Sequence, residues 1–406
     1  MKILFCSILR RVFWLFGMLV AGITLAQSTP AIVWSTNLYS IFPVLNVAFS
    51  GDGTLLISSA GRTTSVWRVS DKSLVRAFSL STEAISAAIS PDRTLLGAGA
   101  SGGGNAVWRL SDGLQLRSSP NSDVNEKVKG IRSLAFSADS SAVAFGRGGG
   151  IILSESQNIN GLPFENPSGQ DGNERGVFDV RFSPDGTLLA SANEDGTASL
   201  FRMPEGTLIR DLTGHGNRAT SVDFSRDGRL LASCAWDGTA RLWRVEDGAA
   251  LRTLNTGFLY GRTARFSADG KTLVTSFEGT SGQRALQFWR VSDGKLLLSY
   301  TNINSGPIAV SPDGKHFAYG TGTVYDTNAA VVLARMPLLI TNAGVRTNAF
   351  QLEWQGGTGT YHVEQRTNLS AGPWELLAGP VTNTNLTVPM TNSSSFFRVQ
   401  SVDTPP

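Results

Sequence analysis

Residues 215–258, HGNRATSVDFSRDGRLLASCAWDGTARLWRVEDGAALRTLNTGF, contain four short runs that read as β-strands. The runs SVDF, LLASCA, ARLWRV and ALRTL are separated by the turn sequences RDG, WDG and EDG. Alternating or apolar runs joined by Asp-Gly turns predict antiparallel hairpins. The stretch therefore predicts a four-stranded meander, which needs neighbouring sheets because it cannot bury both of its faces alone.

The first turn of this unit recurs along the chain and supplies those neighbours. Its form is Ser-x-Asp, beginning at Ser50, Ser90, Ser137, Ser183, Ser225, Ser267 and Ser311. Successive copies are 40, 47, 46, 42, 42 and 44 residues apart, the length of a propeller blade. A large apolar residue precedes each serine: Phe49, Ile89, Phe136, Phe182, Phe224, Phe266 and Val310. We expect this apolar column to pack between neighbouring blades.

A second column lies in the third run of each unit. It is formed by Trp67, Trp108, Phe201, Trp243 and Trp289, mostly within WRVSDG or a close variant. With both columns, residues 31–337 resemble the WD-repeat family, and the resemblance implies a seven-bladed β-propeller. Two units depart from the pattern, with Ser154 and Leu333 where tryptophan is expected.

One unit also matches the hydrogen-bonded tetrad of that family, on His215, Ser233, Asp237 and Trp243. A buried imidazole that bridges a carboxylate, a hydroxyl and an indole N–H leaves no polar group unpaired. We interpret these four residues as a structural tetrad. The other units have no histidine in the equivalent place.

The N-terminus has the pattern of a secretory signal over residues 1–26. Lys2, Arg10 and Arg11 precede an uncharged run, residues 12–26, that is too short to span a bilayer. We expect cleavage near Gln27 and an exported protein that is periplasmic, cell-surface or secreted, with no membrane insertion after cleavage. An uncleaved anchor is the alternative.

The propeller domain is expected over residues 27–337. The seventh unit ends at Pro337 without a fourth strand of its own, so we expect Ile32–Ser35 to pair there and close the ring.

The repeat stops after Pro337 and the composition shifts to Thr, Asn and Gly. Residues 338–406 are expected to form a second, small β domain with about five strands. Trp354, Tyr361 and the run FFRVQSV (residues 396–402) resemble a fibronectin type III or immunoglobulin-like sandwich. The predicted fold class is therefore all-β, a seven-bladed propeller followed by a β-sandwich-like domain.

Several classes of function are disfavoured by the sequence. The net charge of +3 is spread along the chain without a Lys/Arg run, so nucleic acid is not indicated as a partner. The histidines, His215, His316 and His362, have no metal-ligand spacing. Cys234 lies within LLASCA and is interpreted as a core residue. We expect no cofactor, no metal and no catalytic residues.

Candidate partner-binding residues lie in the loops that form the usual docking face in the family. Arg132, Phe178 and Arg262 lie five residues before the repeated serine. Arg218 and Tyr260 lie seven residues before it, and Trp236 occupies the turn ahead of Asp237. Aromatic residues and arginine are enriched in interface hot spots.

We interpret the chain as a non-catalytic scaffold that binds an unidentified protein partner. Two alternatives stay open: binding of polysaccharide or cell wall, and a propeller enzyme with a bound cofactor such as a quinone.

Overall fold

The computed structural model describes residues 3–7, 30–38, 40, 42–119, 130–156, 176–280, 282–301, 303, 306–322, 329–337, 339–346, 349–355, 361–366, 375–381, 385–389 and 395–401. Their regular elements are all β-strands. The chain divides into two compact units, one comprising Ile32–Ala334 and the other comprising Met1–Ala31 with Arg335–Pro406.

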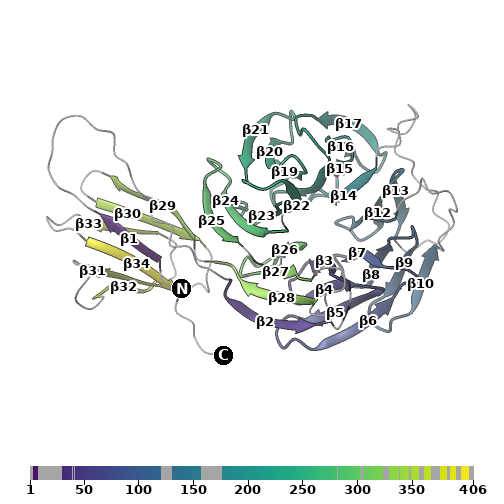
Figure 1. The fold of residues 1–406 in the computed structure, drawn as a ribbon, viewed down its shortest axis with the longest axis horizontal. Coiled ribbons are helices and arrows are strands. Elements are labelled where there is room, and N and C mark those ends of the chain that lie inside the picture. The colour runs from purple at the N-terminus through teal and green to yellow at the C-terminus, as the bar shows by residue number, and fades with distance from the viewer. Residues whose placement is uncertain are drawn as a thin grey trace. The chain divides into compact units, whose positions relative to one another are not determined.

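The unit Ile32–Ala334 is a propeller. Seven antiparallel sheets, the blades, surround a common axis (Figure 1). The innermost strands of neighbouring blades contact one another all the way round the ring. The predicted seven-bladed, all-β propeller is therefore confirmed.

The first three blades hold the strands β3 to β13. They are β3 (Val44–Phe49), β4 (Leu55–Ala60), β5 (Thr63–Arg68) and β6 (Leu74–Ser79); β7 (Ala84–Ile89), β8 (Leu95–Ala100), β9 (Asn105–Arg109) and β10 (Gln115–Ser119); and β11 (Ser133–Phe136), β12 (Ala142–Arg147) and β13 (Gly150–Glu155). The sequence predicts an insertion between blades three and four over residues 156–175, of which all but Ser156 lie outside the described residues.

Blades four to six each have four strands. They are β14 (Val177–Phe182), β15 (Leu188–Asn193), β16 (Ala198–Arg202) and β17 (Thr207–Leu212); β18 (Ala219–Phe224), β19 (Leu230–Ala235), β20 (Thr239–Arg244) and β21 (Ala250–Asn255); and β22 (Tyr260–Phe266), β23 (Thr272–Glu278), β24 (Arg284–Arg290) and β25 (Leu296–Thr301).

The seventh blade joins the two ends of the propeller sequence. It consists of β26 (Ile308–Val310), β27 (His316–Gly320), β28 (Ala330–Arg335) and, as its outer strand, β2 (Ile32–Asn37). β2 pairs antiparallel with β28, and Trp34 lies opposite Leu333. Trp34 also donates an Nε1 hydrogen bond of 3.0 Å to the carbonyl of Val69 in blade one. Ring closure by the N-terminal strand, expected from the sequence, is confirmed.

The Ser-x-Asp turns are built by their own side chains. In blade five, Ser225 Oγ donates to Asp227 Oδ1 at 2.6 Å and accepts from the N–H of Leu230 at 2.9 Å. The hydrogen bonds from Ser225 Oγ and the Arg229 N–H lower the pKa of Asp227 below its ordinary value. Gly228 completes the turn with a φ of 71°, which a residue with a side chain rarely adopts. These aspartates therefore fix the turns between the first and second strands of the blades.

The core lies between blades. Phe224 and Trp243 of blade five pack with Ala190 and Leu200 of blade four in one buried cluster. The next cluster joins Leu242 of blade five to residues of blade six in the same way. Each blade thus covers the apolar face of its neighbour, which is why a single meander needs a ring. The expected packing of the apolar column between blades is confirmed for six of its seven members, Phe49, Ile89, Phe136, Phe182, Phe224 and Phe266.

The tetrad residues of blade five form one chain of hydrogen bonds. Trp243 Nε1 donates to Ser233 Oγ at 2.8 Å, and Ser233 Oγ lies 2.8 Å from His215 Nε2. His215 Nδ1 lies 3.0 Å from Asp237 Oδ2, and the His215 side chain is fully buried. Burial alone would raise the pKa of Asp237, but the hydrogen bonds from His215 and from the Gly216 N–H hold it well below its ordinary value.

Replacing Asp237 with alanine should lower the free energy of unfolding by about 1–3 kcal/mol, because His215 loses its partner. The control is Asp247→Ala, which removes an exposed turn aspartate of the same blade and should cost at most about 1 kcal/mol. Denaturant unfolding measures both. Since the folded pKa of Asp237 is depressed, the contribution is present above pH ~4 and shrinks as the pH falls below it. A loss below about 0.5 kcal/mol at neutral pH would contradict a stabilising tetrad.

The second unit contains two described sheets. One has the order β1 (Ile3–Ser7), β34 (Ser395–Ser401), β31 (Tyr361–Arg366) and β32 (Glu375–Val381). The other has the order β29 (Leu339–Arg346), β30 (Ala349–Gln355) and β33 (Asn385–Pro389). β1 lies within the segment for which the sequence predicts a cleaved signal, whereas residues 8–29 lie outside the described residues. Among described residues, helices long and apolar enough to cross a membrane are absent.

Candidate docking face

The six candidate partner-binding residues lie at corresponding ends of four consecutive blades. Arg132 directly precedes β11, Phe178 is the second residue of β14, and Arg218 directly precedes β18. Trp236 lies in the turn between β19 and β20. Tyr260 and Arg262 lie at the start of β22. These six residues are called the docking face below.

Five of them form one continuous group of contacts. The ring of Trp236 lies 5.6 Å from that of Tyr260, edge to face, and 6.4 Å from that of Phe178. The guanidinium of Arg132 lies 4.1 Å from the centre of the Phe178 ring, and that of Arg218 lies 5.3 Å from Trp236. These separations are typical of aromatic and cation–π pairs.

Arg262 lies beside this group and pairs with a carboxylate. Its Nη2 is 2.6 Å from Glu278 Oε2, which also lies 3.5 Å from Arg284 Nε. Arg218 is paired as well, with Glu194 Oε1 at 3.0 Å. The ion pairs hold two long side chains of the docking face in place, although at half-exposed positions they contribute little to stability.

Trp236 is less exposed than its position at a turn tip suggests. The sequence predicts a side chain that projects from the turn, but the indole is half-buried between Phe178 and Tyr260. The reason is that blades four and six each bring an aromatic ring to its side. The exposed part of the group includes Tyr260, with 37% of its surface accessible.

A β-bulge turns Phe178 and Arg262 toward the propeller axis. The register of β14 with β15 shifts between Val177 and Asp179, so Phe178 is an extra, unpaired residue. β22 has the same shift between Gly261 and Thr263, around Arg262. A bulge re-aims the side chain of the extra residue. Six of the seven residues that lie five positions before a repeated serine line the central channel: Leu45, Ile85, Arg132, Phe178, Thr220 and Arg262.

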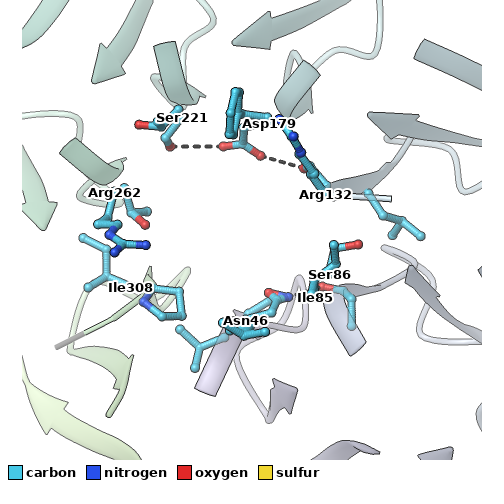
Figure 2. A pocket seen from close by; sticks show the side chains of 18 of the residues that line it. Asn46, Ile85, Ser86, Arg132, Asp179, Ser221, Arg262 and Ile308 are labelled. Carbon is cyan, nitrogen blue, oxygen red and sulfur yellow. Dashed lines mark hydrogen bonds between the residues drawn. The ribbon is translucent and has the colours of Figure 1, made fainter. Parts of the chain in front are cut away.

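The channel encloses a cavity of about 120 Å³ lined by residues of the innermost strands. Figure 2 shows Asp179, Ser221 and Arg262 on one side of its open centre, with Asn46 and Ser86 across from them. Arg132 and Phe178 of the docking face also line it. The docking face and the channel are therefore continuous.

A buried carboxylate, Asp179, organises the channel wall. Its Oδ1 accepts a hydrogen bond of 2.7 Å from Ser133 Oγ, and its Oδ2 accepts one of 3.0 Å from Ser221 Oγ. Arg265 Nη2 lies 3.3 Å from Oδ2, and Arg181 Nη2 lies 3.7 Å from Oδ1. Burial alone would raise the pKa of Asp179, but Arg181 and Arg265 hold it below its ordinary value. The carboxylate thus links blades three to six.

Asp223 behaves differently although it belongs to the same network. It accepts a hydrogen bond of 2.8 Å from the N–H of Phe266. Burial raises its pKa above the ordinary value, and Arg265 and Arg181 offset this only in part. Arg181 and Arg265 lie within ion-pair distance of Asp179, at 3.7 Å and 3.3 Å.

Sequence reasoning missed this network, although a signal for it was present. Asp179 lies four residues before its repeated serine, where the other innermost strands also have mainly small polar residues. Two residues before the serine, blades four to six have Arg181, Asp223 and Arg265 where blades one to three have alanine. Since the side chains of a strand alternate, these positions share one face. Charges of alternating sign at that place indicate a polar channel.

Cys234 is buried, as the sequence suggests. Burial raises the pKa of its thiol to about 12, so the thiol stays protonated at neutral pH. Within the part of the chain that the structure describes, there is no group of three or more His, Cys, Asp or Glu residues that could hold a metal ion.

Comparison with known proteins identifies the repeats. A family model described as WD domain, G-beta repeat, matches residues 167–202 and 206–244. The first range contains β14 to β16 and the second contains β17 to β20 with the tetrad. A comparison with curated proteins gave no significant match. The matched repeats and the seven sheets together show that the chain carries WD40 repeats within a seven-bladed β-propeller.

Proposed function

We propose that the protein is an exported, non-catalytic scaffold that binds a protein partner through the docking face. A WD40 propeller is consistent with a protein-binding role. The observation that carries the proposal is the continuous group of Arg132, Phe178, Trp236, Arg218 and Tyr260 on one face.

The composition and order of this group support the proposal. Binding hot spots are enriched in Trp, Tyr and Arg, and they work best where the side chains are already held in place. Trp236 is held by two rings and one guanidinium, so little conformational freedom would remain to be lost on binding. A partner would cover the accessible part of Trp236 and Tyr260.

The second unit fits an accessory role in this proposal. Its two described sheets and the aromatic pattern of residues 354–402 support a fibronectin type III-like sandwich. Such a module would act as a spacer or as an adhesive element for an exported protein. The signal-like sequence of residues 1–26 supports export.

Replacing Trp236 with alanine should weaken partner binding by about 2 kcal/mol or more, roughly thirtyfold in affinity. It should also lower the free energy of unfolding by about 1–3 kcal/mol, because the two ring contacts with Phe178 and Tyr260 are lost. The partner is captured from the native cell envelope by cross-linking and identified, and its dissociation constant is then measured. Leu208→Ala, which truncates an exposed outer-strand residue, is the control and should bind as the wild type.

If Trp236→Ala binds the partner with unchanged affinity, the partner binds at a site other than the docking face. A glycan array provides the competing outcome. Saturable binding of one glycan class that Trp236→Ala abolishes would favour polysaccharide over protein as the ligand.

The mature protein should begin near Gln27, because the short uncharged run of residues 12–26 and the small residues at its end fit a cleaved signal. Intact mass measurement of the exported protein checks this. Retention of residues 1–26 would contradict cleavage and would keep the strand β1 beside β34.

A further inference from the structure

The channel mouth has an excess of positive charge. The cavity of about 120 Å³ is lined by Arg132, Arg181, Arg262 and Arg265, and its lining contains a single carboxylate, that of Asp179. Including the paired groups around it, six arginines face four carboxylates: Arg132, Arg181, Arg218, Arg262, Arg265 and Arg284 against Asp179, Asp223, Glu194 and Glu278. The local field at the mouth therefore favours an anion.

Arg132 is the least satisfied of these arginines. Its Nη1 is buried and has no hydrogen-bond partner among the described residues, while Arg262 and Arg265 each contact a carboxylate. Its guanidinium lies over the Phe178 ring at the edge of the cavity. Burial lowers the pKa of Arg132, and nearby Glu194 offsets this only in part. The group nonetheless stays charged at neutral pH because the pKa of arginine is so high.

A buried donor without a partner is costly, and a charged donor more so. A carboxylate that reached Arg132 would replace the missing partner with a charge-assisted hydrogen bond, which is stronger than a neutral one. On the measure by which the cavity has about 120 Å³, a single water needs about 10–15 Å³. The cavity therefore has room for one carboxylate side chain together with several waters.

We propose that the channel mouth receives an aspartate or glutamate side chain from an acidic segment of the protein partner, with Arg132 as its main contact. The neighbouring residues of that segment lie across Phe178, Trp236 and Tyr260. Arg262, Arg181 and Arg265 add to the attraction without giving up their own pairs. This inference rests on the proposed function, since it names the chemistry of the partner that the docking face binds.

The test uses short random peptides displayed in a library and selected against the full chain. The selected peptides should be enriched in Asp and Glu, with an aromatic or apolar residue nearby. Each peptide is then compared with a version in which Glu is replaced by Gln and Asp by Asn, on the wild type and on three variants. The variants are Arg132→Gln, Trp236→Ala and Arg226→Gln, an exposed arginine at the opposite end of β19.

We expect the neutral peptides to bind at least tenfold more weakly than the acidic ones to the wild type. Arg132→Gln should remove this difference, whereas Arg226→Gln should keep it. Raising the salt from about 0.1 M to about 1 M, which shortens the screening length from about 10 Å to about 3 Å, should weaken the acidic peptides more than the neutral ones. If Arg132→Gln does not fold, Arg132→Lys replaces it; because lysine keeps the charge but loses the planar fork, the difference between acidic and neutral peptides should then shrink without disappearing.

The outcomes separate this inference from the proposed function. If the selected peptides are neutral or basic but still require Trp236 for binding, the partner does not bind through an acidic segment. The proposal that the docking face binds the partner would then still hold. Acidic peptides that bind Arg132→Gln as well as the wild type would also overturn the inference of an acidic segment. Peptides that bind independently of both Trp236 and Arg132, or a library without binders, would contradict both.

Discussion

Replacing Asp179 with alanine should lower the free energy of unfolding by about 3–5 kcal/mol, the typical cost of removing one member of a buried ion pair. The change leaves the positive charges of Arg181 and Arg265 in the channel with only Asp223 to balance them. It also removes the acceptor of Ser133 and Ser221. Denaturant unfolding at neutral pH measures the loss.

Two further variants make this result interpretable. Glu205→Ala removes an exposed carboxylate from the turn between β16 and β17 and should change stability by no more than about 0.5 kcal/mol. Asp179→Asn keeps an acceptor for Ser133 but not the charge, so its loss should lie between the two. Equal stability of Asp179→Ala and Glu205→Ala would contradict a buried ion pair and would mean that Arg181 and Arg265 are sufficiently hydrated without Asp179.

Deleting residues 27–36 should produce the second large effect, a loss of about 3 kcal/mol or more together with aggregation. The deletion removes β2 from β28 and takes away Trp34, which is partly buried against the core between blades seven and one and donates a hydrogen bond to Val69. Full burial of a large aromatic side chain is worth about 3–5 kcal/mol, so Trp34 supplies part of the loss and the strand pairing supplies the rest. The exposed edge of β28 can then pair with another chain. Size-exclusion chromatography and denaturant unfolding measure the two effects.

Point variants separate the role of Trp34 from that of the strand. Ile32→Ala changes a side chain that is 56% exposed and should cost no more than about 0.5 kcal/mol. Trp34→Ala should reproduce part of the destabilisation without the aggregation, because β2 still covers the edge. A truncated protein that stays monomeric and equally stable would show that the ring is closed by other residues.

The architecture could be predicted from the sequence because its signals are local and repeated. The Ser-x-Asp turn needs only residues within five positions of one another, as the bonds of Ser225 to Asp227 and Leu230 show. Seven copies then imply the ring. The pairing of β2 with β28 was predictable because the seventh unit of the sequence supplies three strands of its blade, so the fourth had to come from elsewhere in the chain.

The candidate site was only partly predictable, since its geometry depends on contacts between blades. The six residues were identified by position, but the half-burial of Trp236 arises from Phe178 and Tyr260, which belong to other blades. The channel network likewise joins Asp179 of blade four to Arg265 of blade six. The alternating charges of Arg181, Asp223 and Arg265 are visible in the sequence. That these positions face the central channel becomes evident only when the strands are arranged around an axis.

The seam between β2 and β28 also constrains the order of folding. Ile32 pairs with Ala334, so β2 and its partner β28 lie at opposite ends of the propeller sequence. β2 can therefore pair only after nearly the whole propeller sequence has been synthesised. Contacts between residues so far apart in sequence form slowly, because the loop that joins them must first be closed. Blades with local hairpins can therefore form early, whereas closure of the ring is a late step. Until that step, both ends of the ring expose unpaired strand edges, and the period before closure is when the protein is most prone to associate with other chains.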